Sequence, residues 1–272
     1  MSAGASRAGP PRLLAGYVVA YLVFLYLPMV LIPLFSFNDA VQAAFPLKGF
    51  TLGWYRALAA NDSLKGAVAN SLLVGAASAA AATACGFAIA YADVRGRSRL
   101  ARPVALAARL PILMPGVILG IALLVLVNLV GLGPSLPAVV AGHVVFCLPI
   151  AVVVLRARLA ALPRSLEEAA MDLGADEWTT LRRVVLPLAA PAVASSLMLT
   201  FITSFDEFIV AFFLTGTEVT LPIYIWSQLR FPKSLPSVMA LGSLILLASV
   251  LVVALAEWIR RRAGAEAAAA RS

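Results

Sequence analysis

The sequence has little charge, little cysteine and little histidine. Only 12% of its 272 residues are charged and 62% are hydrophobic, whereas a soluble domain is about half apolar and a quarter charged. This balance excludes a single water-soluble core. The two cysteines, Cys85 and Cys147, lie inside apolar segments, so they form neither a disulfide framework nor a zinc site, and we interpret them as packing residues. The single histidine, His143, provides no metal-binding cluster, so we expect no metal and no cofactor.

The hydrophobic residues are grouped in segments long enough to cross a membrane. A bilayer core of about 30 Å requires about 20 helical residues, and backbone groups in lipid must be hydrogen bonded within the chain, which favours helices. The expected spans are 13–37, 66–92, 103–130, 136–155, 186–214 and 238–259. We therefore predict an all-α, polytopic membrane protein with six transmembrane helices. Its single domain is 13–262, between an N-terminal tail, 1–12, and a disordered C-terminal tail, 263–272.

The positions of the basic residues predict the orientation of these spans. Arginines are concentrated before the first span, in the second and fourth connections and after the last span, as Arg7, Arg12, Arg95, Arg97, Arg99, Arg102, Arg156, Arg158, Arg164, Arg182, Arg183, Arg260, Arg261 and Arg262. The opposite connections contain only Lys48, Arg56, Lys65, Arg230 and Lys233. Because cytoplasmic loops collect Lys and Arg, we expect both termini to be cytoplasmic. The same bias explains the net charge of +8 without a nucleic-acid partner.

Two spans carry signals for close packing or for a break. The span 66–92 is rich in Ala, Gly and Ser, small residues that let membrane helices approach one another closely. The span 103–130 contains Pro111, Pro115, Gly116 and Gly120. Transporters often use broken helices at their substrate sites. These residues therefore predict either such a break or a simple irregularity of packing.

The fourth connection, about 159–185, has the pattern of two short helices. Ser165 and Glu168 form an S-x-x-E capping box, which predicts the start of a helix. Gly174 suits the C-terminal end of that helix, and Asp176 suits the N-cap of a second one. We expect this helix–Gly–helix element to lie outside the membrane on the cytoplasmic side.

The first of these helices has one face of apolar and small residues. At helical spacing this face contains Leu166, Ala169, Ala170 and Leu173. Such a helix can lie in the headgroup layer as an amphipathic surface helix. It can also dock in a groove of a cytoplasmic partner. The periodicity does not distinguish these two interpretations.

The fourth connection resembles the EAA signature of ABC importer permeases. The match consists of Glu168-Ala169-Ala170, Gly174 and, after nine further residues, Val184-x-Leu186-Pro187, with Val in place of the usual Ile. The resemblance implies a type I ABC importer permease, MetI-like, in which this loop is the coupling helix that fits a cleft on the ATP-binding subunit. The coupling residues implied in this way are Glu168, Ala169, Ala170, Asp172 and Gly174.

The sequence has no G-x-x-x-x-G-K-[ST] phosphate-binding loop, so the chain has no Walker A site of its own. ATP must then be bound and hydrolysed by a partner, and the chain itself is not an enzyme. The resemblance implies two copies of the ATP-binding subunit and a location in the bacterial inner membrane. Glu168 has two compatible roles, as the capping acid of its helix or as a contact to the ATP-binding subunit.

Two adjacent acids, Asp206 and Glu207, lie in the fifth predicted span. A carboxylate at mid-membrane costs about 2.5–3.5 kcal/mol on insertion scales, and the helical rise of about 1.5 Å per residue places this pair in the outer third of the bilayer, where the cost is smaller. A polar stripe at helical spacing contains Ser196, Thr200, Thr203 and Glu207. The stripe predicts a wet path that favours a cationic solute, or else a structural site for arginines or waters of a neighbouring subunit.

The acidic segment is similar to the spermidine/putrescine (PotC-like) branch of these permeases. The similar segments are SFDEF, FF-x-T-G, Thr220-Leu221-Pro222, Trp54-Tyr55, Asn70-Ser71-Leu72 and Leu110-Pro111 to Pro115-Gly116. The resemblance implies polyamine import, in which Asp206 and Glu207 attract ammonium groups and Phe205 and Phe208 provide aromatic contact. It also implies a second, PotB-like permease subunit and an extracytoplasmic substrate-binding protein, all set in membrane lipid.

Three other interpretations remain open from the residues. Permeases of this branch also carry other small solutes, such as phosphonates, opines or iron complexes. An ion-coupled secondary transporter would use Asp206 and Glu207 as proton or sodium sites and would work without partners. The phenylalanines beside the acids can equally be packing or lipid-facing residues.

Overall fold

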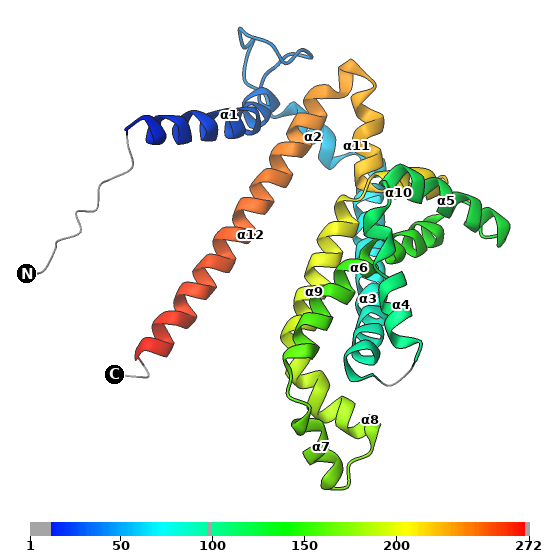
Figure 1. The fold of residues 1–272 in the computed structure, drawn as a ribbon. Coiled ribbons are helices and arrows are strands. Elements are labelled where there is room, and N and C mark those ends of the chain that lie inside the picture. The colour runs from blue at the N-terminus through cyan, green and yellow to red at the C-terminus, as the bar shows by residue number, and fades with distance from the viewer. Residues whose placement is uncertain (1–11, 97–98, 270–272) are drawn as a thin grey trace, which may run out of the picture. The chain divides into compact units, whose positions relative to one another are not determined.

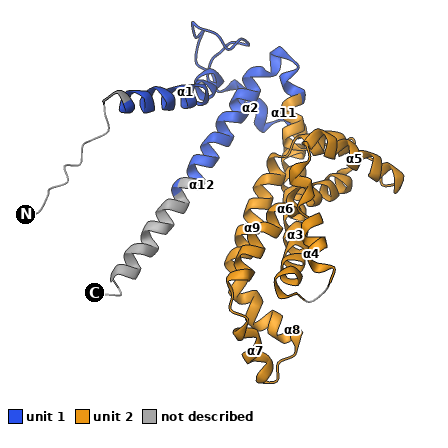
Figure 2. Ribbon diagram, in the orientation of Figure 1, with its two compact units in different colours: residues 1–61, 227–272 blue, residues 62–226 orange. Residues whose placement is uncertain are grey.

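The computed structural model describes residues 12–96 and 99–269. Apart from an isolated β-bridge between Asn38 and Phe50, these residues form helices, turns and loops. The chain divides into two compact units (Figure 2). Unit 1 contains residues 1–61 and 227–272, and unit 2 contains residues 62–226. The predicted N-terminal tail lies almost wholly outside the described residues.

Unit 1 is built on two long helices, and its elements are α1 (Arg12–Ser36), α2 (Gly53–Ala59), η3 (Pro232–Ser234) and α12 (Leu235–Ala269). Both α1 and α2 pack against α12. Helix α2 is held to the end of α1 by a hydrogen bond of 2.6 Å between the hydroxyls of Ser36 and Tyr55. Helix α12 runs to Ala269, and so includes most of the segment 263–272 for which the sequence predicts disorder.

Unit 2 contains the remaining elements (Figure 1). They are α3 (Asp62–Arg95), α4 (Ala101–Ala107), η1 (Leu110–Leu113), α5 (Gly116–Leu129), α6 (Leu136–Ala161), α7 (Ser165–Asp172), α8 (Glu177–Thr180), η2 (Leu181–Val185), α9 (Leu186–Asp206), α10 (Ile209–Leu214) and α11 (Leu221–Leu229), the last of which crosses the boundary to unit 1. Helices α3, α6 and α9 pack against one another and form the centre of the unit.

Small residues let the central helices of unit 2 touch. A Cβ atom added to Gly86 of α3 would lie 2.7 Å from the Cβ of Ala151 in α6, so any larger residue there would push the helices apart. Hydroxyl groups join the same helices, as between Thr83 and Ser196 at 3.0 Å. The prediction that the span rich in Ala, Gly and Ser packs closely is confirmed.

Five helices of the described residues are long and apolar enough to span a membrane, or six if one bent pair forms a single span. The bent pair is Ala101–Leu113 with Gly116–Leu129, and the direction of the helix changes by 116° between them. Met114 is extended and Pro115, which has no backbone N–H to continue the helix, is the N-cap residue of α5. Of the two alternatives open for the third hydrophobic segment, the structure shows the break, and the predicted all-α membrane fold is confirmed.

Candidate functional site

The turn that ends helix α7 contains a glycine in the left-handed backbone conformation. Gly174 has a φ of +88°, which glycine adopts without steric cost. Its N–H donates to the carbonyl of Met171 at 2.9 Å, and the N–H of Ala175 donates to the carbonyl of Ala170 at 3.0 Å. This pair of hydrogen bonds is the Schellman motif. The predicted glycine cap is confirmed.

Asp176 begins the next helix. Its carboxylate accepts a hydrogen bond of 2.9 Å from the N–H of Thr179, and its backbone is extended, which is the geometry of an N-cap. The hydrogen bonds from Thr179 hold the pKa of the Asp176 carboxyl below its ordinary value. The predicted second helix start is confirmed.

The predicted capping box at the start of α7 is wrong. The N-cap residue is Arg164, which has helical backbone angles and makes no side-chain cap hydrogen bond, and Ser165 is already the first helical residue. A capping hydroxyl needs an extended backbone at the N-cap position, which Ser165 does not have. The carboxylate of Glu168 instead lies 3.5 Å from the Nε of Arg164, one turn earlier on the surface.

Glu167, which is not among the predicted site residues, is the acid that connects α7 to α3. Its Oε1 accepts a hydrogen bond of 2.6 Å from the Nε of Arg95, and its Oε2 accepts one of 3.1 Å from the hydroxyl of Tyr91. Both donors belong to the last turns of α3. The side chains of Arg95 and Glu167 are only 8% and 10% exposed. Two consecutive glutamates give no sequence signal for which of them is buried.

The predicted coupling residues lie along α7 and in the turn that follows it, and most of them are exposed. Glu168, Ala169, Asp172 and Gly174 are exposed, and Ala170 is half-buried. The two leucines of the predicted docking face, Leu166 and Leu173, are exposed too, and Leu173 is 90% exposed. This face is therefore available for a further protein or for lipid.

Helix α8 continues into α9 without a loop. The helical segment runs from Glu177 to Asp206 and includes the π-helical turn η2. Such turns are rare in proteins overall, and those that occur are often found at functional sites. The sequence predicts the second short helix and the fifth span as separate elements. This prediction is wrong, because the structure joins them in one continuous helical rod.

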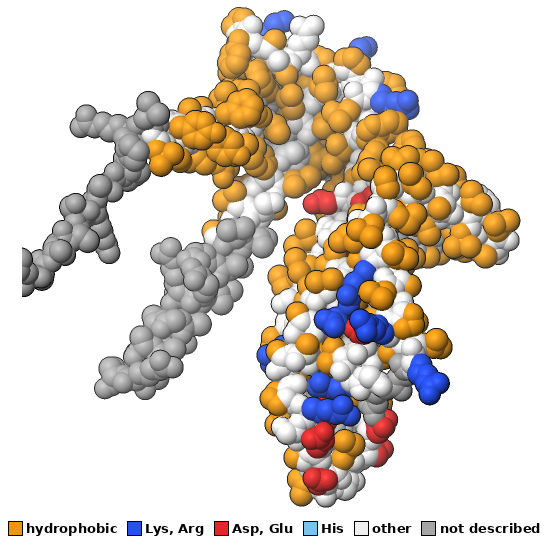
Figure 3. Space-filling model, viewed as in Figure 1, with side chains coloured by type: hydrophobic (Ala, Val, Ile, Leu, Met, Phe, Trp, Pro, Cys, Tyr) orange, Lys and Arg blue, Asp and Glu red, His pale blue; other side chains and the backbone are white. Residues whose placement is uncertain are grey.

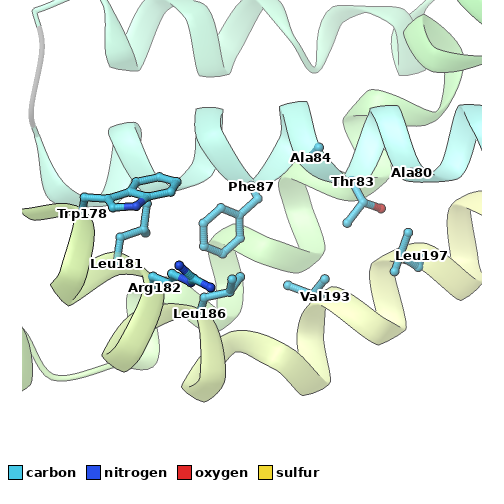
Figure 4. Close-up of a pocket in the computed structure, with 10 residues that line it drawn as sticks. All are labelled: Ala80, Thr83, Ala84, Phe87, Trp178, Leu181, Arg182, Leu186, Val193 and Leu197. Carbon is cyan, nitrogen blue, oxygen red and sulfur yellow. The ribbon is translucent and has the colours of Figure 1, made fainter.

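An apolar groove of about 540 Å³ runs beside this rod (Figure 4). Phe87 of α3 lies in its middle, Trp178 of α8 lies at one end, and Val193 and Leu197 of α9 lie along the other side. Arg182 is the charged residue among those that line it, and none of them is acidic. Because a polyamine is a polycation, this groove does not offer it an ionic site.

The acidic pair lies where α9 ends. Asp206 is the last residue of α9, and Glu207 has a ψ of 115° that stops the helix. The carboxylate of Glu207 accepts a hydrogen bond of 2.9 Å from the N–H of Val210, near the start of α10. The predicted helical stripe therefore does not continue to Glu207, because the helix has already ended. Asp206 is exposed and Glu207 is half-buried.

The hydroxyl groups of the predicted stripe make hydrogen bonds inside unit 2. Ser196 and Thr200 are buried, and the Oγ1 of Thr200 donates to the carbonyl of Ser196 at 2.7 Å. Thr203 is half-buried. Ser204, in the last turn of α9, is buried and lies 2.7 Å from the Nδ1 of His143. These contacts anchor the end of α9 directly before the acidic pair.

Aromatic rings surround the break after the acidic pair. The ring of Phe208 lies 5.8 Å from that of Trp226, and Phe212 lies 5.3 Å from Trp226, measured between centroids. Phe205 instead stacks on Phe201 at 5.9 Å. Of the two predicted aromatic contacts, Phe208 thus belongs to a cluster with Phe212, Phe213 and Trp226. Trp226 is not among the residues predicted for the site.

The charges of unit 2 are divided between its ends. Charged side chains gather over α7 and α8, whereas the flank over α5 is hydrophobic (Figure 3). At the α7–α8 end, Asp93 binds Arg156 at 2.6 Å in addition to the Glu167–Arg95 pair. Among the side chains of unit 2 that the structure describes, no ion pair joins Asp206 or Glu207 to a lysine or arginine.

Known proteins resemble this chain over most of its length. It is 37% identical over 248 residues to the spermidine/putrescine transport system permease protein PotC of Escherichia coli strain K12, covering 90% of this chain and 93% of that protein. It is 36% identical to the putrescine transport system permease protein PotI of the same strain, covering 88% of each chain.

A solved structure shares the fold. A chain of a bacterial ABC transporter involved in the import of the acidic polysaccharide alginate superimposes with a TM-score of 0.70 at 18% identity, covering 92% of this chain and 94% of that one. The predicted architecture of an ABC importer permease is thereby confirmed. Residues 82–264 match the family described as the inner membrane component of binding-protein-dependent transport systems. This match covers more than half of the sequence, and the chain belongs to that family.

Proposed function

We propose that this chain is the polyamine-conducting permease subunit of an ATP-driven importer, with spermidine or putrescine as solute. The observation that carries the proposal is the pair Asp206–Glu207 at the end of α9, beside Phe208 and Trp226 and without an ion-pair partner among the described residues. Carboxylates attract ammonium groups, and aromatic faces add about 0.5–2 kcal/mol for each cation–π contact. The likeness to PotC and PotI supports the same class of solute.

The proposed complex contains further subunits. Two ATP-binding subunits supply the energy, and one of them docks on α7 and the turn after it, through Glu168, Ala169, Ala170, Asp172 and Gly174. A second, PotB-like permease completes the path, and an extracytoplasmic binding protein delivers the solute. ATP binds to the partner, and this chain binds no cofactor of its own. Both termini and the α7–α8 end are cytoplasmic, as the arginine distribution indicates.

Reconstitution tests this proposal. The chain is incorporated into proteoliposomes with its neighbouring ATP-binding subunit, second permease and binding protein, and uptake of radiolabelled spermidine and putrescine is measured. The double variant Asp206→Asn with Glu207→Gln keeps the shape of both side chains and removes their charge. Since a contact with a charged group is worth about 1.5–3 kcal/mol, we expect uptake to fall by about tenfold or more with assembly of the complex unchanged.

Glu218→Gln is the matched control, because Glu218 is an exposed acid in the loop that follows α10. Its uptake should equal that of the unmodified protein. Undiminished polyamine uptake by the double variant would contradict the proposal that Asp206 and Glu207 line a path for a cationic solute. Uptake by the chain alone, driven by an ion gradient, would instead identify a secondary transporter.

A further inference from the structure

The end of α3 is the part of unit 2 to which α7 is tied through buried polar groups. Arg95 donates from its Nε to the Oε1 of Glu167 at 2.6 Å, and Tyr91 donates from its hydroxyl to the Oε2 at 3.1 Å. Glu167 thus receives a donor on each carboxylate oxygen. Arg95 also approaches the carbonyl of Leu162 at 3.5 Å, in the segment that leads into α7.

This ion pair differs in kind from the one made by the neighbouring glutamate. Arg95 and Glu167 are 8% and 10% exposed, whereas Arg164 and Glu168 are 69% and 58% exposed and lie on one helix. An exposed pair of that kind contributes little, since water screens it and both side chains are mobile. A buried pair with satisfied hydrogen bonds is held strongly, because breaking it leaves an uncompensated charge out of water.

The same end of α3 is also joined to α6 and lies close to a basic residue near η1. Asp93 accepts a hydrogen bond of 2.6 Å from the Nε of Arg156 in α6 and lies 3.8 Å from Arg109. Below these groups, Tyr91 packs with Leu159 and Val185 in one buried cluster. A displacement of α7 therefore meets a stiff junction rather than a loose loop.

We propose that Glu167 is a positioning residue for energy coupling, which makes α7 and α3 move as one body through its ion pair with Arg95. The chain already connects α8 to α9 without a loop. The Glu167 junction provides the second route, so that a displacement of the α7–α8 element reaches α3 and α9 together. This inference rests on the proposed function, in which an ATP-binding subunit docks on α7.

The first test compares ATP hydrolysis with transport in the reconstituted complex. Glu167→Gln keeps the size of the side chain and removes its charge. We expect the ATPase rate to remain while uptake falls, so that the number of ATP molecules hydrolysed per solute rises by about 5- to 150-fold, the usual range for coupling between sites. Asp62→Asn is the matched control, because it breaks the exposed Asp62–Lys65 pair on the same helix, and its ratio should not change.

The second test needs no partner subunit and no transport. Spin labels are attached to Ala88→Cys in α3 and Met171→Cys in α7, both exposed, in a chain with Cys85→Ser and Cys147→Ala. We expect a narrow distance distribution with Glu167 and a broad one with Glu167→Gln. An unbroadened distribution together with an unchanged ATP-to-solute ratio would overturn the inference. A complex with Glu167 intact that fails to couple ATP to polyamine uptake would overturn the proposed function instead, and the spin-label result would still stand.

Discussion

The two ends of unit 2 place acidic side chains in opposite settings. At the α7–α8 end, Glu167 and Asp93 face arginines at hydrogen-bonding distance. At the α10–α11 end, Asp206 and Glu207 have no such cation among the described residues, and an aromatic cluster lies next to them. A paired acid fixes two helices to each other, whereas an acid without a cation leaves its charge for a ligand. Under the proposed function, the comparison separates an acid that joins two helices for coupling from acids that bind the solute.

The largest expected effect is a loss of transport when Gly174 is changed. A leucine at its φ of +88° is strained by about 1–2 kcal/mol and places a bulky side chain on the proposed docking face. We expect Gly174→Leu to abolish uptake and to loosen the ATP-binding subunit, measured by co-purification. Gly131→Leu, at a φ of +77° with equally open space in the loop before α6, carries the same strain away from α7. Normal uptake by Gly174→Leu would contradict docking at this place.

The next largest effect is a difference in the stability of the folded permease between acid substitutions at the two ends of unit 2. Glu167→Ala leaves the buried charge of Arg95 without a carboxylate to balance it, which costs about 3–5 kcal/mol. Asp206→Ala removes an exposed charge that has no ion pair, so the thermal midpoint of the purified permease should stay the same. Denaturation followed by tryptophan fluorescence in detergent gives both values. Equal midpoints for the two variants would remove the distinction between the ends.

A smaller effect is expected from the aromatic cluster. Trp226→Ala removes one ring from beside Phe208 and Phe212 and with it about 0.5–2 kcal/mol of cation–π attraction. The KM for polyamine uptake should rise several-fold while the ATPase rate is kept. Trp226→Phe retains an aromatic face and should restore most of the affinity. An unchanged KM in the alanine variant would show that the solute does not contact Trp226, and only the acids would remain as its proposed contacts.

The smallest effect concerns the start of α8. Asp176→Ala removes the side-chain oxygen that accepts from the Thr179 N–H, so hydrogen exchange of the Thr179 amide should become faster. Asp176→Asn keeps an acceptor oxygen, so exchange should stay slower than in the alanine variant. Because the folded pKa of Asp176 is lowered, its cap contributes fully above the ordinary pKa of about 3.9. The contribution disappears as the pH falls through the lowered folded pKa. A protection factor of the Thr179 amide, corrected for the intrinsic pH dependence of exchange, that stays constant in this range would contradict the cap.

The features that follow from local chemistry could be predicted from the sequence. Hydrophobic length predicts the membrane helices, Gly174 and Asp176 mark the ends of two short helices, and Pro115 marks the break before α5. Each depends on a few residues in one segment, where backbone preference decides the conformation.

The features that depend on distant contacts could not be predicted. Glu167 and Glu168 are chemically identical neighbours, and Glu167 is buried because α7 packs against a residue 72 positions away. The stripe that ends at Glu207 assumes a continuous helix, but the Glu207 carboxylate binds the N–H of Val210 and the chain turns there. The role of Trp226 depends on α11 folding back toward Phe208 and Phe212.

The unbroken rod from Glu177 to Asp206 also limits how this segment can change in evolution. Removing or inserting one residue in an α-helix turns everything beyond it by about 100° and shifts it by about 1.5 Å. Such a change would rotate the docking surface away from the acidic pair, whereas a substitution would leave their mutual orientation intact. The segment should therefore tolerate many replacements of side chains, but its length should be nearly invariant.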